Sequence, residues 1–222
     1  MHNSYRAYMS TYATPFYLPP VRRRLCMVLL IAGAVLLASG CKQSVDQQEL
    51  FKATDVAGAN FARDFQLTDH NGQPRTMSDF KSRVVVLFFG YIHCPDICPN
   101  TLSELAAVMQ RLGSDADKVQ VLFVTLDPER DTSAILAQFV PSFNPNFIGL
   151  YGTSSQIAET AKEYKLVVQK LPGKRKGSYT LDHSAGTYIY DTAGKLRLYA
   201  SYGLGVDALV ADIRVLLEEA VR

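Results

Sequence analysis

The chain has 222 residues, of which 48% are hydrophobic, and its net charge is +2. This small charge gives no support for a nucleic-acid-binding protein or a ligand of acidic polymers. Four cysteines are too few for a small disulfide-built scaffold, and the length suits one domain with its own hydrophobic core.

Residues 1–41 have the composition of an export signal. Three arginines, Arg22 to Arg24, precede a short apolar stretch that ends in small residues and Cys41. The ending is similar to a bacterial lipobox, although Ala38 stands where leucine is usual. We predict that Cys41 is lipidated; the alternatives are an uncleaved signal anchor and plain secretion. In each case we expect the domain on the periplasmic or another extracytoplasmic face, where disulfides persist.

Residues 42–56 are polar and predict a tether, so the folded domain is expected to span residues 57–222. Near its start, Asn71-Gly72 between two strand-like runs predicts a β-hairpin. The run "RVVVLFFGYI" is apolar and rich in β-branched and aromatic residues, as in a strand buried on both faces. The helix pattern "TLSELAAVMQRLG" follows, with Thr101 and Glu104 as a capping box and Gly113 as its end.

The rest of the chain alternates between strand and helix patterns. Strands are predicted at "VQVLFVTLD", "FIGLYGT", "KLVVQKL" and on both sides of Thr192-Ala193-Gly194. Helices are predicted at "TSAILAQFVPSF", which Pro141 ends, at "SSQIAETAKEY" and at "GVDALVADIRVLLEEA". This order indicates an α/β domain with a parallel sheet covered by helices, to which the late hairpin adds antiparallel strands.

Two cysteines, Cys94 and Cys98, lie in "GYIHCPDICPNT", between a buried strand and a helix. Ligands of α/β domains bind at the carboxyl ends of strands, and a helix N-terminus favours thiolate over thiol. A structural disulfide would close a very short loop and stabilise the fold little. The remaining interpretations are a redox couple and a metal site, and a metal site needs a third ligand.

The histidines supply the candidates for that ligand. His70 lies in the predicted hairpin turn, where a solvated side chain is expected. His93 would point away from Cys94 if the chain there is extended. His183, in "LDHSAGTYIYD", is distant in sequence and could approach the cysteines in the fold, although its position alone also fits an ordinary loop histidine.

Three motifs together, "FFGYIHCPDICPNT", "VTLDPERDT" and "LDHSAGTYIYD", resemble the SCO/SenC family of thioredoxin-like copper proteins, over residues 56 to 220. The resemblance implies a thioredoxin-like fold: a central mixed β-sheet flanked by helices, with an N-terminal β-hairpin extension. It also implies one copper ion, Cu(I) or Cu(II), bound by Cys94, Cys98 and His183. Ile92 and Asn100 depart from the threonines more usual there, but neither is a ligand position.

The donor set agrees with that metal. Thiolates suit Cu(I), and imidazole suits copper in either oxidation state. A closed zinc site would need a fourth cysteine or histidine. The resemblance gives Asp127 a supporting role near the copper loop, against a plain turn aspartate. Asp131 is expected to cap a helix, and Asp182 either orients the His183 ring or is solvated.

The resemblance further implies a copper metallochaperone that assists assembly of the dinuclear copper site of a haem-copper respiratory oxidase. Its partners would be the copper-domain subunit of that oxidase, an upstream copper donor, a thiol reductant and, through the lipid anchor, the membrane. Such a carrier is not an enzyme, and no nucleic-acid partner is expected. The alternative is a thiol–disulfide oxidoreductase that reduces the copper-ligand cysteines of the oxidase, which does not need His183 as a ligand.

A basic segment shortly before His183 has two interpretations. It contains Lys170, Lys174, Arg175 and Lys176. The segment is either a mobile, solvated loop or a docking patch whose positive charge steers an acidic partner to the copper site.

Overall fold

The computed structural model describes residues 50–221. The predicted export signal, Cys41 and the first part of the predicted tether lie outside this range. No helix within residues 50–221 has the length and apolar character to span a membrane.

A mixed β-sheet forms the centre of the domain, with the strand order β1-β10-β9-β4-β5-β6-β2-β3. β4 (Val84–Gly90) pairs in parallel with β5 (Val119–Thr125) and antiparallel with β9 (Thr187–Tyr190). β6 (Ile148–Tyr151) is parallel to β5. Every residue of β4 and β5 is buried, which confirms the two central strands predicted from continuous apolar runs.

The edges of the sheet are antiparallel. At one edge β2 (Leu67–Asp69) pairs with β3 (Pro74–Arg75), which confirms the hairpin predicted around Asn71-Gly72. At the other edge β10 (Leu196–Ala200) pairs with β1 (Thr54–Asp55).

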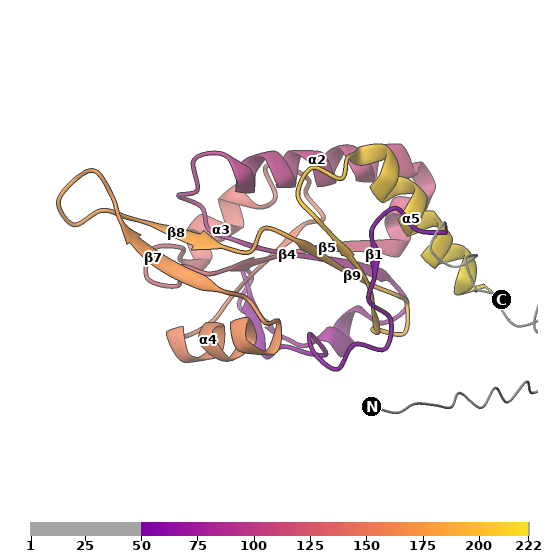
Figure 1. The fold of residues 1–222 in the computed structure, drawn as a ribbon, viewed down its shortest axis with the longest axis horizontal. Helices are drawn as coiled ribbons and strands as arrows, with labels where there is room; N and C mark the ends of the chain where they lie inside the picture. The colour runs from indigo at the N-terminus through magenta and orange to yellow at the C-terminus, as the bar shows by residue number, and fades with distance from the viewer. Residues whose placement is uncertain (1–49, 222) are drawn as a thin grey trace, which may run out of the picture. The chain divides into compact units, whose positions relative to one another are not determined.

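Helices cover both faces of the sheet. They are α2 (Ile97–Leu112), α3 (Ser133–Phe139), α4 (Ser154–Glu163) and α5 (Val206–Glu219), with two short 3₁₀ helices, η1 (Met77–Phe80) and η2 (Gly113–Lys118). α2 and α5 lie on one face and α4 on the other (Figure 1).

Successive side chains of β4 point to opposite faces, so each face of the sheet has its own core. Val84, Val86 and Phe88 pack in the cluster that includes the apolar sides of α2 and α5. Val85, Leu87 and Phe89 pack in the cluster on the side of α4.

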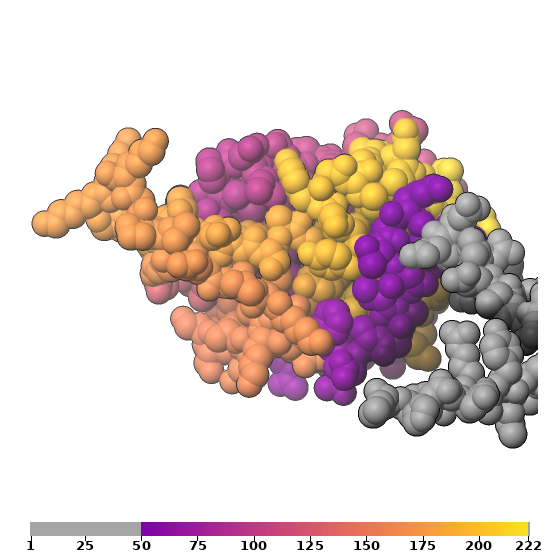
Figure 2. Space-filling view, viewed as in Figure 1, coloured from indigo at the N-terminus to yellow at the C-terminus, as the bar shows by residue number. Residues whose placement is uncertain are grey.

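A second, two-stranded sheet projects from this body (Figures 1 and 2). β7 (Val168–Pro172) and β8 (Tyr179–His183) pair with each other, with Val168 opposite His183. β7 was predicted from its sequence, whereas β8 was not. The projecting hairpin therefore ends at the predicted histidine ligand.

Two predicted boundaries are wrong. The predicted tether extends to residue 56, but β1 belongs to the main sheet, and Phe51 and Ala53 are buried. The domain therefore begins several residues before residue 57. The first residue of α2 is Ile97, so Thr101 lies inside the helix and its hydroxyl donates to the carbonyl of Ile97. The predicted end of this helix at Gly113 is confirmed.

Candidate metal centre

The cysteine loop follows the central strand directly. β4 ends at Gly90, Cys94 is partly exposed in the loop, and Cys98 is buried in the first turn of α2. A Cβ at Gly90 would lie 2.9 Å from Cys98 Sγ, so glycine at the strand end lets this sulfur approach the backbone. The strand and helix thus place both sulfurs at the carboxyl end of β4, as predicted.

Both cysteines are free thiols, and Cys94 lies near enough to Cys98 to influence its pKa. Burial raises the pKa of the Cys98 thiol, the neighbouring Cys94 raises it further, and a backbone hydrogen bond from Tyr91 opposes the rise. In the copper-free protein, burial therefore favours the neutral thiol of Cys98, against the preference for thiolate expected at the helix N-terminus. A soft cation bound between the sulfurs would supply the missing stabilisation of the thiolate.

The Asp131 carboxylate is hydrogen-bonded to the backbone of the cysteine loop. This buried group accepts hydrogen bonds from the Ile92 N–H at 3.0 Å and the Thr125 hydroxyl at 2.6 Å. Burial raises the pKa of this carboxyl, against the effect of these two donors. The prediction that Asp131 caps a helix is wrong, because Thr132 is the N-cap of α3.

His183 occupies the end of β8 and faces the body of the domain. Burial lowers the pKa of its imidazole, which favours the neutral form that binds metals. Its Nδ1 lies 3.0 Å from the carbonyl oxygen of Ser184. A carbonyl only accepts, so the proton of the neutral ring belongs on Nδ1, and Nε2 keeps a free lone pair.

Tyr91 adjoins both parts of the predicted site. Its ring meets that of His183 edge-on, with 6.3 Å between the centroids. Burial raises the pKa of its phenol, and Cys94 and Cys98 add to this shift. Within residues 50–221 no three His, Cys, Asp or Glu side chains are grouped closely enough to hold a metal ion. The structure thus places the two cysteines at one strand end, and His183 lies against Tyr91 without joining them in a closed three-ligand group.

The two predicted supporting aspartates lie elsewhere. Asp127 is buried and accepts hydrogen bonds from Tyr179 and Arg130, so it joins the loop after β5 to β8. Asp182 is exposed, because it alternates with His183 along β8. The hydrogen-bond partner of the imidazole is the carbonyl of Ser184 instead of the Asp182 carboxylate.

The other two described histidines have different surroundings. His93 is largely exposed, and its Nδ1 lies 3.8 Å from Asp131 Oδ1. His70, expected to be solvated, is partly buried and accepts a hydrogen bond from the Gly149 N–H at 3.0 Å. It therefore fixes the β2–β3 turn to β6, far along the sheet from the cysteine loop.

Reasoning from the sequence missed Tyr91, Arg130 and Tyr179, and it assigned Asp131 to a helix cap instead of the cysteine loop. An available signal was the density of charged residues in "LDPERD" directly after a buried strand, at the edge where α/β domains place ligands. Tyr91 and Tyr179 gave no such signal, because a tyrosine at a strand end is more often part of the core.

Known proteins are similar to this chain in sequence. The sequence profile of the SCO1/SenC family matches residues 53–218. The mouse protein "Protein SCO2 homolog, mitochondrial" is 34% identical over 202 residues, which are 88% of this chain and 79% of that protein.

Solved structures are similar to this chain in sequence and in fold. Copper-bound ScoI of Bradyrhizobium japonicum has 39% identity and a TM-score of 0.64, over 69% of this chain and 98% of that one. Apo Sco1 of Thermus thermophilus has 35% identity and a TM-score of 0.68, over 75% and 97%. These neighbours confirm the predicted thioredoxin-like fold. The chain belongs to the SCO1/SenC family.

Proposed function

We propose that this protein is a copper metallochaperone that binds one copper ion through Cys94, Cys98 and His183. The observation that carries the proposal is the pair of free, adjacent thiols at the end of β4, in a chain 39% identical to a copper-bound relative. Two thiolates and a neutral imidazole are suitable donors for Cu(I), and the same set accepts Cu(II). The ion is cargo, and three ligands from two separate segments, the cysteine loop with the first turn of α2 and the end of β8, suit its release.

The proposed client is the copper-domain subunit of a haem-copper respiratory oxidase, whose dinuclear copper site this protein would help to assemble. An upstream copper donor would load the protein, and a thiol reductant would keep the cysteine pair reduced. We further propose an extracytoplasmic location with a membrane tether at lipidated Cys41. The early start of the folded domain supports a short tether, because residues 51–56 are already packed on the body.

A copper-binding experiment tests the proposal. The full chain, reduced and kept in mild detergent, is titrated with Cu(I) against a competing chelator and with Cu(II) while thiolate charge-transfer absorption is recorded. We expect one copper per chain. His183→Ala should lower the affinity by more than the roughly 10- to 100-fold loss that follows removal of a ligand's supporting hydrogen bond. His93→Ala is the matched control, because that histidine adjoins Cys94 and is not a proposed ligand.

One observation favours the alternative, a thiol–disulfide oxidoreductase. Cys94 is partly exposed and Cys98 is buried, which resembles an attacking thiol beside a resolving one. Oxidation to a disulfide would release two electrons and two protons to a substrate disulfide and would remove both thiolate ligands. Copper binding that is indifferent to His183→Ala, together with fast exchange with a model disulfide, would favour this function over the carrier.

A further inference from the structure

The position of His183 depends on side-chain contacts of the projecting hairpin. Strands β7 and β8 form a sheet of their own, so the described backbone does not pair them with β4 or β5. Along β8 the partly buried residues are Tyr179, Leu181 and His183, and the residues between them are exposed. The face that carries the proposed ligand is thus the face that packs on the body.

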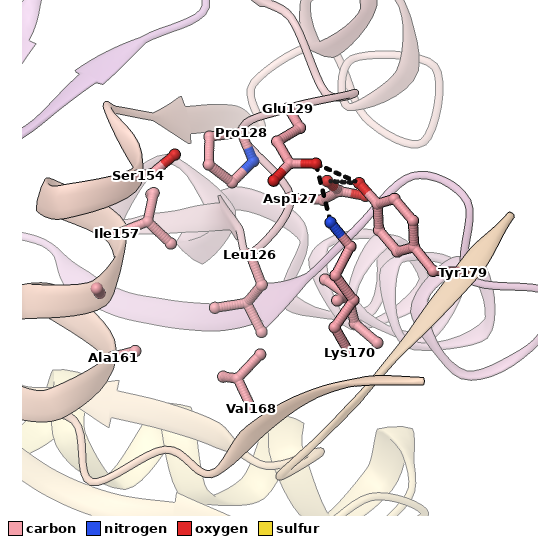
Figure 3. Close-up of a pocket in the computed structure, with 12 residues that line it drawn as sticks. Leu126, Asp127, Pro128, Glu129, Ser154, Ile157, Ala161, Val168, Lys170 and Tyr179 are labelled. Atoms are coloured by element: carbon pink, nitrogen blue, oxygen red, sulfur yellow. Dashed lines mark hydrogen bonds and ion pairs between the residues drawn. The ribbon is translucent and has the colours of Figure 1, made fainter. Parts of the chain in front are cut away.

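Tyr179, the first residue of β8, contacts several charged side chains of the body and of β7. Its ring lies between two cations, with Arg130 Cζ at 3.6 Å and Lys170 Nζ at 3.8 Å from the ring centroid. Its hydroxyl donates to Asp127 Oδ1 at 2.7 Å, a contact drawn in Figure 3. Lys170 also forms an ion pair with Glu129 at 2.9 Å. Asp127, Glu129, Lys170 and Tyr179 line one side of a pocket of about 230 Å³, and its apolar lining includes Leu126, Ile157 and Val168.

Arg130 connects this hairpin contact to the cysteine side of the molecule. Its Nε donates to Asp127 Oδ2 at 2.5 Å and its Nη1 to the carbonyl of Tyr179 at 3.2 Å. Its Cζ also lies 6.0 Å from the ring centroid of Tyr91. The next residue, Asp131, receives the Ile92 N–H of the cysteine loop. One short loop, residues 127–131, therefore holds both the cysteine loop and the hairpin.

We infer that Arg130 and Tyr179 form a clamp that positions His183 relative to Cys94 and Cys98. The inference rests on the proposed ligand role of His183. The Arg130 and Asp127 side chains are only 25% and 3% exposed, so their contacts are partly shielded from water and stronger than a surface ion pair. Without the clamp the hairpin would keep the packing of Leu181 against both core clusters and the Lys170–Glu129 ion pair, but would lose the contacts at the start of β8. Metal ligands on a loosely held element bind more weakly, because the geometry must be ordered on each binding event.

The test uses two variants of Tyr179 and a matched control. Tyr179→Ala removes the ring and the hydroxyl, and Tyr179→Phe keeps the ring between the cations but loses the bond to Asp127. Thr180→Ala is the control, because Thr180 is the exposed neighbour on the opposite face of β8. The full chain is studied without copper by amide hydrogen exchange and with copper by competition titration and Cu(II) absorption.

In copper-free Tyr179→Ala we expect exchange to quicken about tenfold at amides of β7 and β8 and to stay unchanged in β4 and β5. Its copper affinity should fall by a similar factor, and its Cu(II) absorption should shift toward that of His183→Ala. Tyr179→Phe should lie between Tyr179→Ala and the unsubstituted protein, and Thr180→Ala should match the unsubstituted protein.

Two results would overturn the clamp. Exchange in the hairpin that is equal in Tyr179→Ala and in the unsubstituted protein would show that Tyr179 does not hold it. Faster exchange with unaltered copper affinity and spectrum would show that the contact only stabilises the hairpin. Failure of the proposed function has a different signature, because the unsubstituted protein itself would then bind no copper or bind it independently of His183.

Discussion

His70 and His183 are both partly buried, and burial lowers the pKa of each imidazole. The two neutral rings carry their proton on different nitrogens. His70 accepts the Gly149 N–H at Nδ1, so its Nδ1 must be unprotonated. His183 has its Nδ1 against a carbonyl, which leaves Nε2 unprotonated on a face near Tyr91. One histidine is therefore structural and the other has the lone pair that a metal requires.

His70 should make the stability of the domain depend on pH. Its folded-state pKa lies below the unfolded value of about 6.5, so below that pH the unfolded chain binds a proton that the folded protein resists. The stabilisation is present above pH 6.5 and is lost as the pH falls. The nearby Asp69 carboxylate, paired with Arg75, partly offsets this effect of burial.

The corresponding experiment is urea unfolding of His70→Ala between pH 7.5 and 5.5. We expect a loss of about 1 kcal/mol at pH 7.5, the net value of a hydrogen bond, and a smaller further loss on acidification than in the unsubstituted protein. His93→Gln removes a largely exposed histidine and should keep the pH dependence that His70 contributes. An unaltered pH slope in His70→Ala would contradict the assignment.

At the scale of elements, one buried carboxylate joins the start of the domain to its last helix. Asp212 lies on the inner face of α5 and is fully buried. Its two oxygens accept the N–H groups of Lys52 and Ala53 at 2.8 and 2.7 Å. These bonds hold the residues directly before β1 and so keep β1 against β10.

Replacement of Asp212 by asparagine should detach this first segment. An asparagine has only one acceptor oxygen, and its NH₂ group would face a backbone donor, so one bond is lost and a buried N–H is left unpaired. We expect Asp212→Asn to lower the free energy of unfolding by about 2 kcal/mol and to speed amide exchange at Thr54 and Asp55. Asp207→Asn on the same helix loses only an exposed ion pair with Arg111, so it should lower the free energy of unfolding much less and leave exchange at Thr54 and Asp55 unchanged. Equal exchange in both variants would refute the anchor.

Elements with continuous apolar runs or clear helical periodicity were predictable from the sequence, and elements stabilised by distant polar partners were not. The buried strands β4 and β5 belong to the first kind. β1 has two exposed residues and exists because Asp212 binds the residues before it. β8 alternates buried and exposed side chains over only five residues, and its partner β7 is exposed throughout. Such short, mostly solvated strands carry little hydrophobic signal.

The same distinction applies to the site. The cysteine pair could be placed at a strand end from local sequence alone, because the flanking strand and helix are strongly patterned. His183 depended on a family resemblance, since its hairpin has no strong local pattern. The contacts of Asp131 with Ile92 and of Arg130 with Tyr179 join segments 39 and 49 residues apart, and no local pattern encodes them.

At the scale of the whole molecule, the net charge of +2 is small, but three cations gather in one turn. Lys174, Arg175 and Lys176 are exposed and lie between β7 and β8, in the hairpin that projects from the body in Figure 2. None of them forms an ion pair with another residue of the described range. Lys170, the fourth cation of the segment, differs because it pairs with Glu129 and stacks on Tyr179.

The tip that carries these cations has its own hydrogen bonds. Gly173 donates to the carbonyl of Ser178, and the Ser178 hydroxyl donates to the carbonyl of Arg175 at 2.7 Å. The same hairpin ends at His183, so an acidic surface bound at the tip would lie within one strand length of the proposed copper ligand. This geometry favours a docking role over a merely solvated turn.

Neutralising the tip should therefore slow docking without weakening copper binding. In the triple variant Lys174→Ala, Arg175→Ala and Lys176→Ala, we expect copper transfer to the soluble copper domain of the host's respiratory oxidase to be about tenfold slower at low salt. The difference should vanish near 1 M salt, where the screening length is about 3 Å. The matched control removes three exposed cations elsewhere on the domain, Lys81, Lys162 and Lys195. Equal transfer rates for the two triple variants at low salt would mean that only overall charge matters and that the tip is not the docking surface.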